Sequence, residues 1–402
     1  MKEKILFITN LLPYPLDNGG KIKTFNTIES LSEKFDIDVI CYISDEEDRR
    51  NIAGLRGIAN DVQVVCKNLI RSVSFKDFFI DYMKSLMTKY PYNVNKFRHP
   101  DFERLILNKL SNNKYYAIYV DHLQMMVYYD LFNHENTILD QHNVESLIFK
   151  RLIQSENSVV KKALGAIEYK KLRKFEIGML HKAGQVICLS EEDQKEFMQL
   201  GINKDKINIL PIHLKSSYCK NNKSLSGEKF KLLFLGSMSW YPNQNGIKWF
   251  LENVWVSLDK RYYELYIVGS NPPETIKQYH NGKNVHVTGY VEDINEYIEK
   301  CDISIVPLFI GSGQRVKIIE SFAKGIPVIS TSIGAEGLIY TNGEDIIIAD
   351  TIEDFINRLE DVRSNRGQLD ALTFNAHENF KSNYSAEFLP AKLQKIIENC
   401  RG

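Results

Sequence analysis

Short apolar, β-branched runs recur along the whole chain and alternate with segments of helical periodicity. In the first half these runs lie at 4–9, 36–43, 62–67, 116–121, 137–142, 185–190 and 207–211. In the second half they lie at 231–237, 263–269, 285–290, 303–308, 326–331 and 345–350. Near-continuous apolar strands between helices are typical of parallel sheets that are covered on both faces. The pattern therefore predicts an α/β protein with two doubly wound domains.

A polar stretch rich in Ser, Lys and Asn, at 215–229, divides the two sets of strands and is predicted to be a linker. It separates a first domain, 1–214, from a second, 230–375. The remaining segment, 376–402, is helical in pattern and has no strand after it, so we expect it to cross back to the first domain. Doubly wound domains bind ligands beyond the carboxyl ends of their strands. We therefore look for function at those ends, where the two domains are expected to face each other across a cleft.

The composition narrows the class of protein. Lys+Arg and Asp+Glu both number 51, so the formal net charge of zero argues against a nucleic-acid partner. The six cysteines are scattered and form no CxxC pair, which indicates neither a zinc knuckle nor a disulfide framework. The first apolar run is followed by prolines, and no run is as long as a membrane span. We expect a cytoplasmic protein.

A loop with almost no side chains follows the apolar run at 303–308. It contains Gly311, Ser312 and Gly313. Glycines let the backbone approach a ligand closely, and a helix that starts near Gln314 would aim free N–H groups at the loop. This combination is suited to phosphate. The alternative is a plain turn.

Two cations and a carboxylate follow this loop. Arg315 and Lys317 are expected in the first helical turn, where positive charge opposes the helix dipole, so a bound anion would explain them. Glu320 lies further along the helix and is suited to the hydroxyls of a ribose. A nucleoside diphosphate fits all three residues, whereas the alternative is a solvated helix face.

The surrounding motifs resemble the nucleotide-sugar-binding domain of glycosyltransferase family 4, which has the GT-B fold of two Rossmann-like domains. They are "LLFLGSMSWYPNQNGIKWF", "ELYIVGSNPP", "VHVTGYVEDINEYIEKCDISIVPL" and "GSGQRVKIIESFAKGIPVISTSIGAEGL". The first half is similar more loosely, through "LPYPLDNGGKIKTFNTIESLSEKFDIDVI", "VDHLQ", "LDQHNVESLIFKRL" and "VICLSEEDQKEF". Residues 70–115 carry no resemblance.

The resemblance implies a retaining transfer of a sugar from a UDP- or GDP-linked donor to a glycan or lipid-linked acceptor, with no metal and no further cofactor. It assigns Glu320 to the ribose and the loop glycines with Ser312 to the diphosphate. The other implied donor-binding residues are Gly19, Gly20, Gly236, Gly289, Tyr290 and Val291, the last three at the base. His122 would contact the sugar or the acceptor.

Two departures from the family pattern concern charge. Many members have a second Glu where this chain has Ser312, and a basic pair where it has Ser237 and, approximately, Asn245. The leaving diphosphate still needs stabilisation in the transition state. We therefore assign that role to Arg315 and Lys317. Together with His122, which would contact the sugar or the acceptor, they are the predicted catalytic residues.

Several further features are open to two interpretations. His142 and Glu336 are expected to line the cleft, or else to be a helix-cap neighbour and a plain turn residue. The Asp-x-Asp of "DID" (36–38) is favoured as structural, because it lies near the wrong end of its strand for a metal site. The helical segment 150–182 is basic and is expected either to lie on the anionic inner membrane surface or to be a solvated face.

The predicted function is glycosyl transfer in bacterial surface polysaccharide or glycolipid synthesis, by a cytoplasmic protein that is peripheral at the membrane. Two alternatives remain open: a GT-B-fold nucleotide-sugar epimerase, and a non-catalytic nucleotide-sugar-binding protein.

Overall fold

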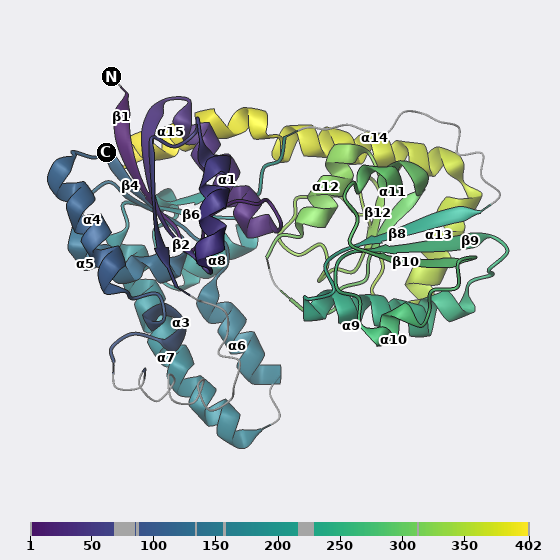
Figure 1. Ribbon diagram of the computed structural model, residues 1–402. Helices are drawn as coiled ribbons and strands as arrows, with labels where there is room; N and C mark the ends of the chain where they lie inside the picture. Colours follow the sequence, from purple (N-terminus) through teal and green to yellow (C-terminus); the bar gives the residue numbers. More distant parts are fainter. Residues whose placement is uncertain are drawn as a thin grey trace. The chain divides into compact units, whose positions relative to one another are not determined.

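The chain folds into two compact α/β units, each built on one parallel sheet (Figure 1). The computed structural model describes residues 2–67, 85, 88–132, 135–155, 158–215, 229–311 and 313–400. The first unit comprises Met1–Ile212 and Glu387–Gly402, and the second comprises His213–Ala386. Of the expected linker, 216–228 lie outside the described residues.

The first unit contains a seven-stranded sheet in the order β3-β2-β1-β4-β5-β6-β7. Its strands are β1 (Glu3–Ile8), β2 (Phe35–Ile43), β3 (Asp61–Cys66), β4 (Ala117–Asp121), β5 (Thr137–Asp140), β6 (Gln185–Cys188) and β7 (Ile207–Ile209). All neighbouring pairs are parallel. Its helices are α1 (Gly19–Ser32), α3 (Tyr92–Asn95), α4 (Pro100–Asn112), α5 (Tyr129–Phe132), α6 (Glu145–Ser155), α7 (Val159–Lys182), α8 (Glu191–Gln199) and α15 (Leu389–Asn399), with 3-10 turns η1 (Glu46–Leu55), η2 (Leu123–Tyr128) and η3 (Lys204–Lys206).

The second unit contains a six-stranded sheet in the order β10-β9-β8-β11-β12-β13. Its strands are β8 (Phe230–Leu235), β9 (Tyr263–Val268), β10 (Val285–Gly289), β11 (Ile303–Val306), β12 (Val328–Ser330) and β13 (Ile347–Ile348), again all parallel. Its helices are α9 (Tyr241–Trp249), α10 (Glu274–Lys277), α11 (Asn295–Lys300), α12 (Val316–Lys324), α13 (Ile352–Ser364) and α14 (Arg366–Asn383). A π-helical segment η4 (Phe250–Val254) and two 3-10 turns, η5 (Trp255–Ser257) and η6 (Ala386–Phe388), complete the elements.

Every predicted strand lies on one of these strands, so the predicted α/β class with two doubly wound sheets is confirmed. The reason is visible in β1, whose apolar side chains alternate between the two faces of the sheet. Leu6 and Ile8 belong to the core on one face, and Ile5 and Phe7 to the core on the other. Because both faces are covered, every position from Ile5 to Ile8 is apolar and fully buried.

The last two helices belong to different units. Helix α14 contacts α12, so the second unit continues to Ala386, beyond the expected end at 375. Helix α15 contacts α1 of the first unit and buries Leu389, Leu393 and Ile397 in the core beneath it.

Candidate active site

A buried aspartate at the end of β4 is the centre of the first unit's candidate site. Asp121 is 1% exposed, and its side chain accepts hydrogen bonds from the hydroxyls of Thr9 (2.7 Å) and Thr24 (2.8 Å). It also meets two imidazole rings, at Nε2 of His142 (2.8 Å) and Nδ1 of His122 (3.0 Å). The ring centroids of the two histidines are 3.9 Å apart. The two histidines singled out in the sequence therefore lie side by side, joined by a carboxylate that the sequence reasoning did not assign.

The three ionisable groups shift one another's pKa. Burial alone would raise the pKa of Asp121, but the two rings outweigh burial and hold it well below its usual range. Burial would lower the pKa of His122, yet the Asp121 charge raises it above the ordinary value. Burial, His122 and Lys23 together lower the pKa of His142 to about 4. At neutral pH His142 is therefore neutral, and the Asp121 carboxylate favours the charged form of His122.

The backbone at His122 is in a region that L-residues rarely occupy, with φ 77° and ψ 138°. Its N–H donates to the carbonyl of Asp140 on the neighbouring strand (2.9 Å), and its carbonyl accepts from Met125 (3.1 Å). Such a conformation costs about 1–3 kcal/mol for a residue with a Cβ and is found disproportionately at functional sites.

The Gly19–Gly20 pair begins helix α1, next to His142. Asn18 caps this helix through its side chain. A Cβ added at Gly20 would lie 3.9 Å from Nδ1 of His142. One turn further on, Lys23 is 3% exposed and forms an ion pair with Asp140, which also accepts from the Tyr119 hydroxyl (2.6 Å). Of the predicted first-unit residues, the structure thus brings Gly20, His122 and His142 together.

The donor atoms of Asp121, His122 and His142 lie within 4.8 Å of one another, a spacing that a metal ion could also use. Both oxygens of Asp121 are already occupied by direct hydrogen bonds to the rings, and one oxygen also accepts from the two threonines. A cation would have to break these bonds. The observed geometry is therefore that of a hydrogen-bonded cluster.

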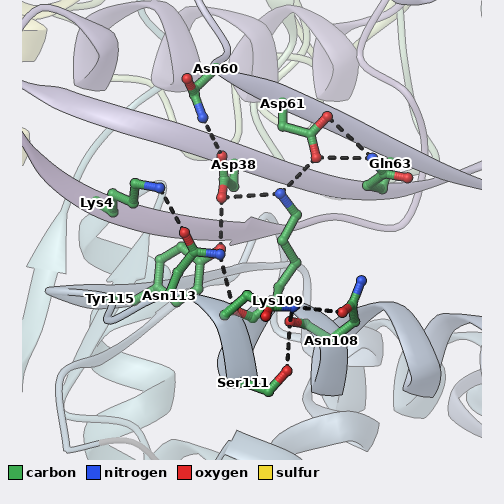
Figure 2. Close-up of polar contacts among 11 residues, drawn as sticks. Lys4, Asp38, Asn60, Asp61, Gln63, Asn108, Lys109, Ser111, Asn113 and Tyr115 are labelled. Carbon is green, nitrogen blue, oxygen red and sulfur yellow. Dashed lines mark hydrogen bonds and ion pairs between the residues drawn. The ribbon is translucent and has the colours of Figure 1, made fainter.

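Asp38 of the "DID" motif lies in a different cluster of the same sheet (Figure 2). Its carboxylate accepts from Asn60 (2.9 Å) and Tyr115 (2.7 Å) and pairs with Lys109 (3.1 Å), which also pairs with Asp61 (2.6 Å). Burial would raise the pKa of Asp38, but these donors hold it below its usual value. Its partners account for Asp38 as a structural residue, which was the favoured interpretation.

In the second unit, glycines stand at the ends of three neighbouring strands. Gly236 follows β8, Gly269 follows β9 and Gly289 ends β10. The N–H of Gly236 donates to Val268, and the N–H of Gly269 donates to Gly289, both at 3.0 Å. A side chain on Gly269 would clash with the carbonyl of Gly236. Gly236 and Gly269 thus allow protein atoms to pack closely at the carboxyl edge of the sheet; Gly269 had not been assigned from the sequence.

Lys317 reaches this edge from helix α12. Its ammonium donates to Oδ1 of Asn243 (2.7 Å), and Nδ2 of Asn243 donates to the carbonyl of Ser237 (2.8 Å). A Cβ on Gly236 would lie 2.7 Å from the Lys317 nitrogen. The ammonium thus occupies the turn after β8, where the family pattern places its basic pair and this chain has none.

Burial lowers the pKa of Lys317 to about 7, and the nearby Arg315 charge adds to this effect, while Glu320 opposes it. Among the described residues, no carboxylate lies within ion-pair distance of the Lys317 ammonium. Its contacts are neutral: the Asn243 amide and the Phe234 ring, whose centre lies 4.8 Å from the ammonium. These contacts stabilise the protonated form less than a carboxylate would. An anionic ligand would stabilise it.

Arg315 is 6% exposed and lies under the glycine-rich loop, with its guanidinium 5.4 Å from the ring centre of Trp240. A Cβ on Gly311, whose φ is 127°, would come within 2.6 Å of that guanidinium. The glycine therefore makes room for Arg315 as well as for a ligand. Burial lowers the pKa of Arg315 to about 10, and Glu336 opposes this shift.

The helix after the loop starts later than expected. Residue 314 was the predicted start, but α12 begins at Val316, and Arg315 is its N-cap with extended dihedral angles (φ −91°, ψ 97°). Arg315 consequently precedes the first turn, while Lys317 lies in it. The amide of Gln314 instead donates to the carbonyl of Gly337 (2.7 Å), which ties the loop to the turn that carries Glu336.

The remaining predicted donor-site residues are distributed along the same edge. Glu320 lies in the middle of α12, and burial raises the pKa of its carboxyl against the influence of Lys324 and Lys317. Tyr290 is 76% exposed, and Val291 packs on a small core. Gly313 has φ 78°, and Ser312 lies outside the described residues.

Residues 229–365 match the family model described as Glycosyl transferases group 1. This glycosyl transferases group 1 segment spans β8 to α13 and so contains the glycine row, Arg315, Lys317 and Glu320. Over the whole chain, a protein of Klebsiella pneumoniae described as an uncharacterized 44.6 kDa protein in the cps region is 22% identical over 400 residues, 96% of this chain and 97% of that protein.

Two solved structures are similar throughout. One is Anabaena Alr3699/HepE in complex with UDP, with a TM-score of 0.70 and 11% identity over 99% of this chain and all of that one. The other is the sucrose-phosphate synthase of Thermosynechococcus elongatus, with a TM-score of 0.69 and 14% identity over 99% and 98% of the two chains. The chain therefore has the GT-B fold, and its second unit carries the glycosyl transferases group 1 segment.

Proposed function

We propose that the protein is a glycosyltransferase of the family 4 type, which moves a sugar with retention from a nucleoside diphosphate sugar to a glycan or glycolipid acceptor. The observation that carries the proposal is the Lys317 ammonium, which lies on Asn243 beside Gly236 without a carboxylate within ion-pair distance among the described residues. Such a cation next to exposed backbone is a site for a diphosphate.

The donor would lie along the carboxyl edge of the second sheet. Glu320 would accept hydrogen bonds from the ribose, and the turn at Gly289–Val291 would pair with the edge of a uracil or guanine base. Lys317 and Arg315 would neutralise the diphosphate, whose charge grows as the sugar leaves, so they act most strongly in the transition state. This mechanism requires no metal ion and no cofactor besides the nucleotide sugar.

The first unit would handle the sugar and the acceptor. Asp121 favours the charged form of His122, which is a poor base. In a retaining transfer the departing phosphate can itself take the proton of the incoming hydroxyl. His122 would therefore orient and polarise through hydrogen bonds. His142 and the N-terminus of α1, at Gly19 and Gly20, are the residues that would complete this pocket.

The setting we propose is polysaccharide synthesis. The cps-region protein of Klebsiella pneumoniae supports it over the full length of the chain, and the UDP in the HepE structure supports a uridine nucleotide as the first donor to try. The choice between a UDP- and a GDP-linked donor is left to experiment.

An acceptor held at a lipid surface is supported by the charge of α7. Its only two acidic residues, Glu168 and Glu176, are 2% and 0% exposed, so the exposed charged side chains of the helix are all basic. Val159 at its start and Leu152 on the adjoining α6 are 80% and 57% exposed. Figure 1 shows α6 and α7 extending together beyond the sheet. Cations mixed with exposed apolar side chains suit an anionic bilayer surface.

Among the described residues no helix is both long and apolar enough to cross a bilayer. Binding to vesicles that contain phosphatidylglycerol, but not to phosphatidylcholine alone, would support the peripheral contact. Replacement of Lys170 and Arg173 by Glu should abolish it. Equal binding to both lipids would contradict it.

The test of the function has two parts. Thermal unfolding with UDP, GDP and their common sugar conjugates identifies the donor, because a ligand at about 100 times its Kd adds about 2.7 kcal/mol. Release of free nucleotide that depends on an added acceptor then supports transfer. Isomerised donor without acceptor would indicate an epimerase, and binding without any turnover a non-catalytic protein.

A further inference from the structure

We infer that Asp121 is a positioning residue that commits both histidines to fixed hydrogen-bonding roles: His122 presents an N–H donor at Nε2, and His142 presents an acceptor at Nδ1. This pair would bind adjacent hydroxyl groups of a sugar. The inference rests on the proposed function for the identity of that ligand, but the arrangement of protons can be measured without it.

The carboxylate of Asp121 determines where each histidine carries a proton. Ionised Asp121 can only accept hydrogen bonds, so each ring nitrogen that touches it must carry a proton. His122 therefore has its proton on Nδ1, and His142 has its proton on Nε2. Thr9 and Thr24 donate to the same side chain and keep it from rotating.

Two ring nitrogens, one in each histidine, face away from Asp121. Among the described residues the structure gives no hydrogen-bond partner to Nε2 of His122 or Nδ1 of His142. A neutral His142 must leave Nδ1 as an acceptor, and this atom lies beside the start of α1, 3.9 Å from the position of a Cβ on Gly20. A charged His122 carries a proton on both nitrogens and so donates through Nε2.

Charged groups surround the pair of rings. Besides each other, three groups act on them: Asp121 from β4, Lys23 from α1 and Glu145 from α6. Lys23 is itself paired with Asp140. Asp121 and Glu145 favour the charged form of His122, whereas Lys23 and the neighbouring ring disfavour a second charge on His142. The surrounding charges therefore favour the charged form of His122 over that of His142.

The backbone conformation of His122 is also unusual. A residue with a Cβ is held at φ 77° only when the surrounding structure enforces it, and here hydrogen bonds on both sides of His122 do so. The strain aims one ring at the carboxylate while the next residues turn into η2.

The direct test is nitrogen NMR of protein labelled at histidine, with the two signals assigned by His122→Gln and His142→Gln. At pH 7 we expect His122 to be protonated at both nitrogens and His142 to be neutral with its proton on Nε2. Two neutral rings, or His142 protonated at Nδ1, would overturn the inference with no other variant required.

Asp121→Asn extends the test to function, and Asp38→Asn is its matched control, since it removes another buried, multiply bonded carboxylate of the same sheet. In Asp121→Asn we expect His122 to become neutral at pH 7, and kcat for sugar transfer to fall about tenfold or more with little change in the donor KM. Asp38→Asn should leave both histidine signals as they are. Unchanged histidine signals in Asp121→Asn would contradict the positioning role.

The positioning role of Asp121 and the proposed function can be contradicted separately. If the histidine protons are arranged as expected but no acceptor supports transfer, the positioning role stands and the proposed function falls. If transfer occurs while the rings are unaffected by Asp121→Asn, the opposite conclusion follows. The thermal unfolding of each variant without ligand, compared with that of the wild type, checks that the first unit is folded.

Discussion

Two lysines, Lys23 in the first unit and the partly buried Lys317 in the second, have opposite surroundings. Lys23 in the first unit is 3% exposed and forms an ion pair with Asp140, which is itself 1% exposed. Lys317 in the second unit donates to the neutral amide of Asn243, and burial lowers its pKa to about 7. The first charge is balanced within the protein, whereas the second is left for a ligand to balance.

The difference separates a structural charge from a functional one. A buried ion pair holds its neighbours in place, and its stability does not depend on a bound ligand. A buried cation without a counter-ion destabilises the unliganded protein, and a site that keeps such a cation is suited to binding an anion. Around Asp121 a third arrangement occurs, in which a carboxylate is balanced by rings that can exchange protons.

The largest effect that we expect comes from replacing the two lysines. Lys23→Met should lower the free energy of unfolding by about 3–5 kcal/mol at pH 7, because it leaves Asp140 buried without its cation. Lys317→Met should leave it unchanged or raise it, since it removes a charge that the fold does not stabilise. Denaturant unfolding of both variants measures the contrast.

The pH dependence of the free energy of unfolding shows whether folding disfavours the charged form of Lys317. Because the pKa of Lys317 is lower in the folded than in the unfolded state, the unfolded state binds more protons between about pH 7 and the ordinary lysine value. Its contribution to the free energy of unfolding therefore rises with pH across that range, and Lys317→Met should flatten the rise. A parallel pH profile in the variant would show that Lys317 has its counter-ion within the protein.

A smaller effect is expected at Glu320. Glu320→Gln should weaken binding of the nucleoside diphosphate by about 1.5–3 kcal/mol, because a carboxylate that accepts ribose hydroxyls makes charge-assisted bonds. Isothermal titration with UDP or GDP measures the change. The matched control is Glu360→Gln on α13, where the carboxylate pairs with Arg363 at 2.8 Å and should not affect binding. Equal affinity of wild type and Glu320→Gln would remove the ribose assignment.

The strands, and with them the edge where the site lies, could be predicted from the sequence because an apolar run buried on both faces leaves an unbroken signal. The glycines and charges of 311–320 could be found for a similar reason, since one loop and one helix hold them. The site contacts made between distant parts of the chain could not. No motif near Asn243 in the sequence indicates that the Lys317 ammonium will donate a hydrogen bond to it.

The role of Asp121 could not be predicted from the sequence either. This residue directly precedes His122, yet its importance depends on Thr9, Thr24 and His142, which come from three other places in the chain. The late start of α12 is a local matter that the pattern missed, because Arg315 adopts an extended conformation that leaves no trace in residue type.

Backbone strain at His122 should give a still smaller but measurable difference. His122→Gly should be more stable than His122→Ala by about 1–2 kcal/mol, since both remove the ring but only glycine accepts the positive φ without strain. Both variants should lose sugar transfer and keep the thermal shift given by UDP or GDP. Equal stability of the two would mean that His122 is not held in the strained conformation in solution.

The most direct test of the central claim, that Lys317 is a cation reserved for a diphosphate, is calorimetric titration of the better of UDP and GDP between pH 7 and 9. Titrations in buffers of different ionisation enthalpy count the protons taken up, and Lys317→Gln serves as the reference for the ligand's own ionisation. Since the free ammonium has a pKa of about 7, we expect wild-type binding to take up a proton and its affinity to fall by up to about tenfold per pH unit. Lys317→Gln should bind more weakly at pH 7 and show neither effect. The same affinity, pH dependence and proton uptake in both proteins would contradict the account.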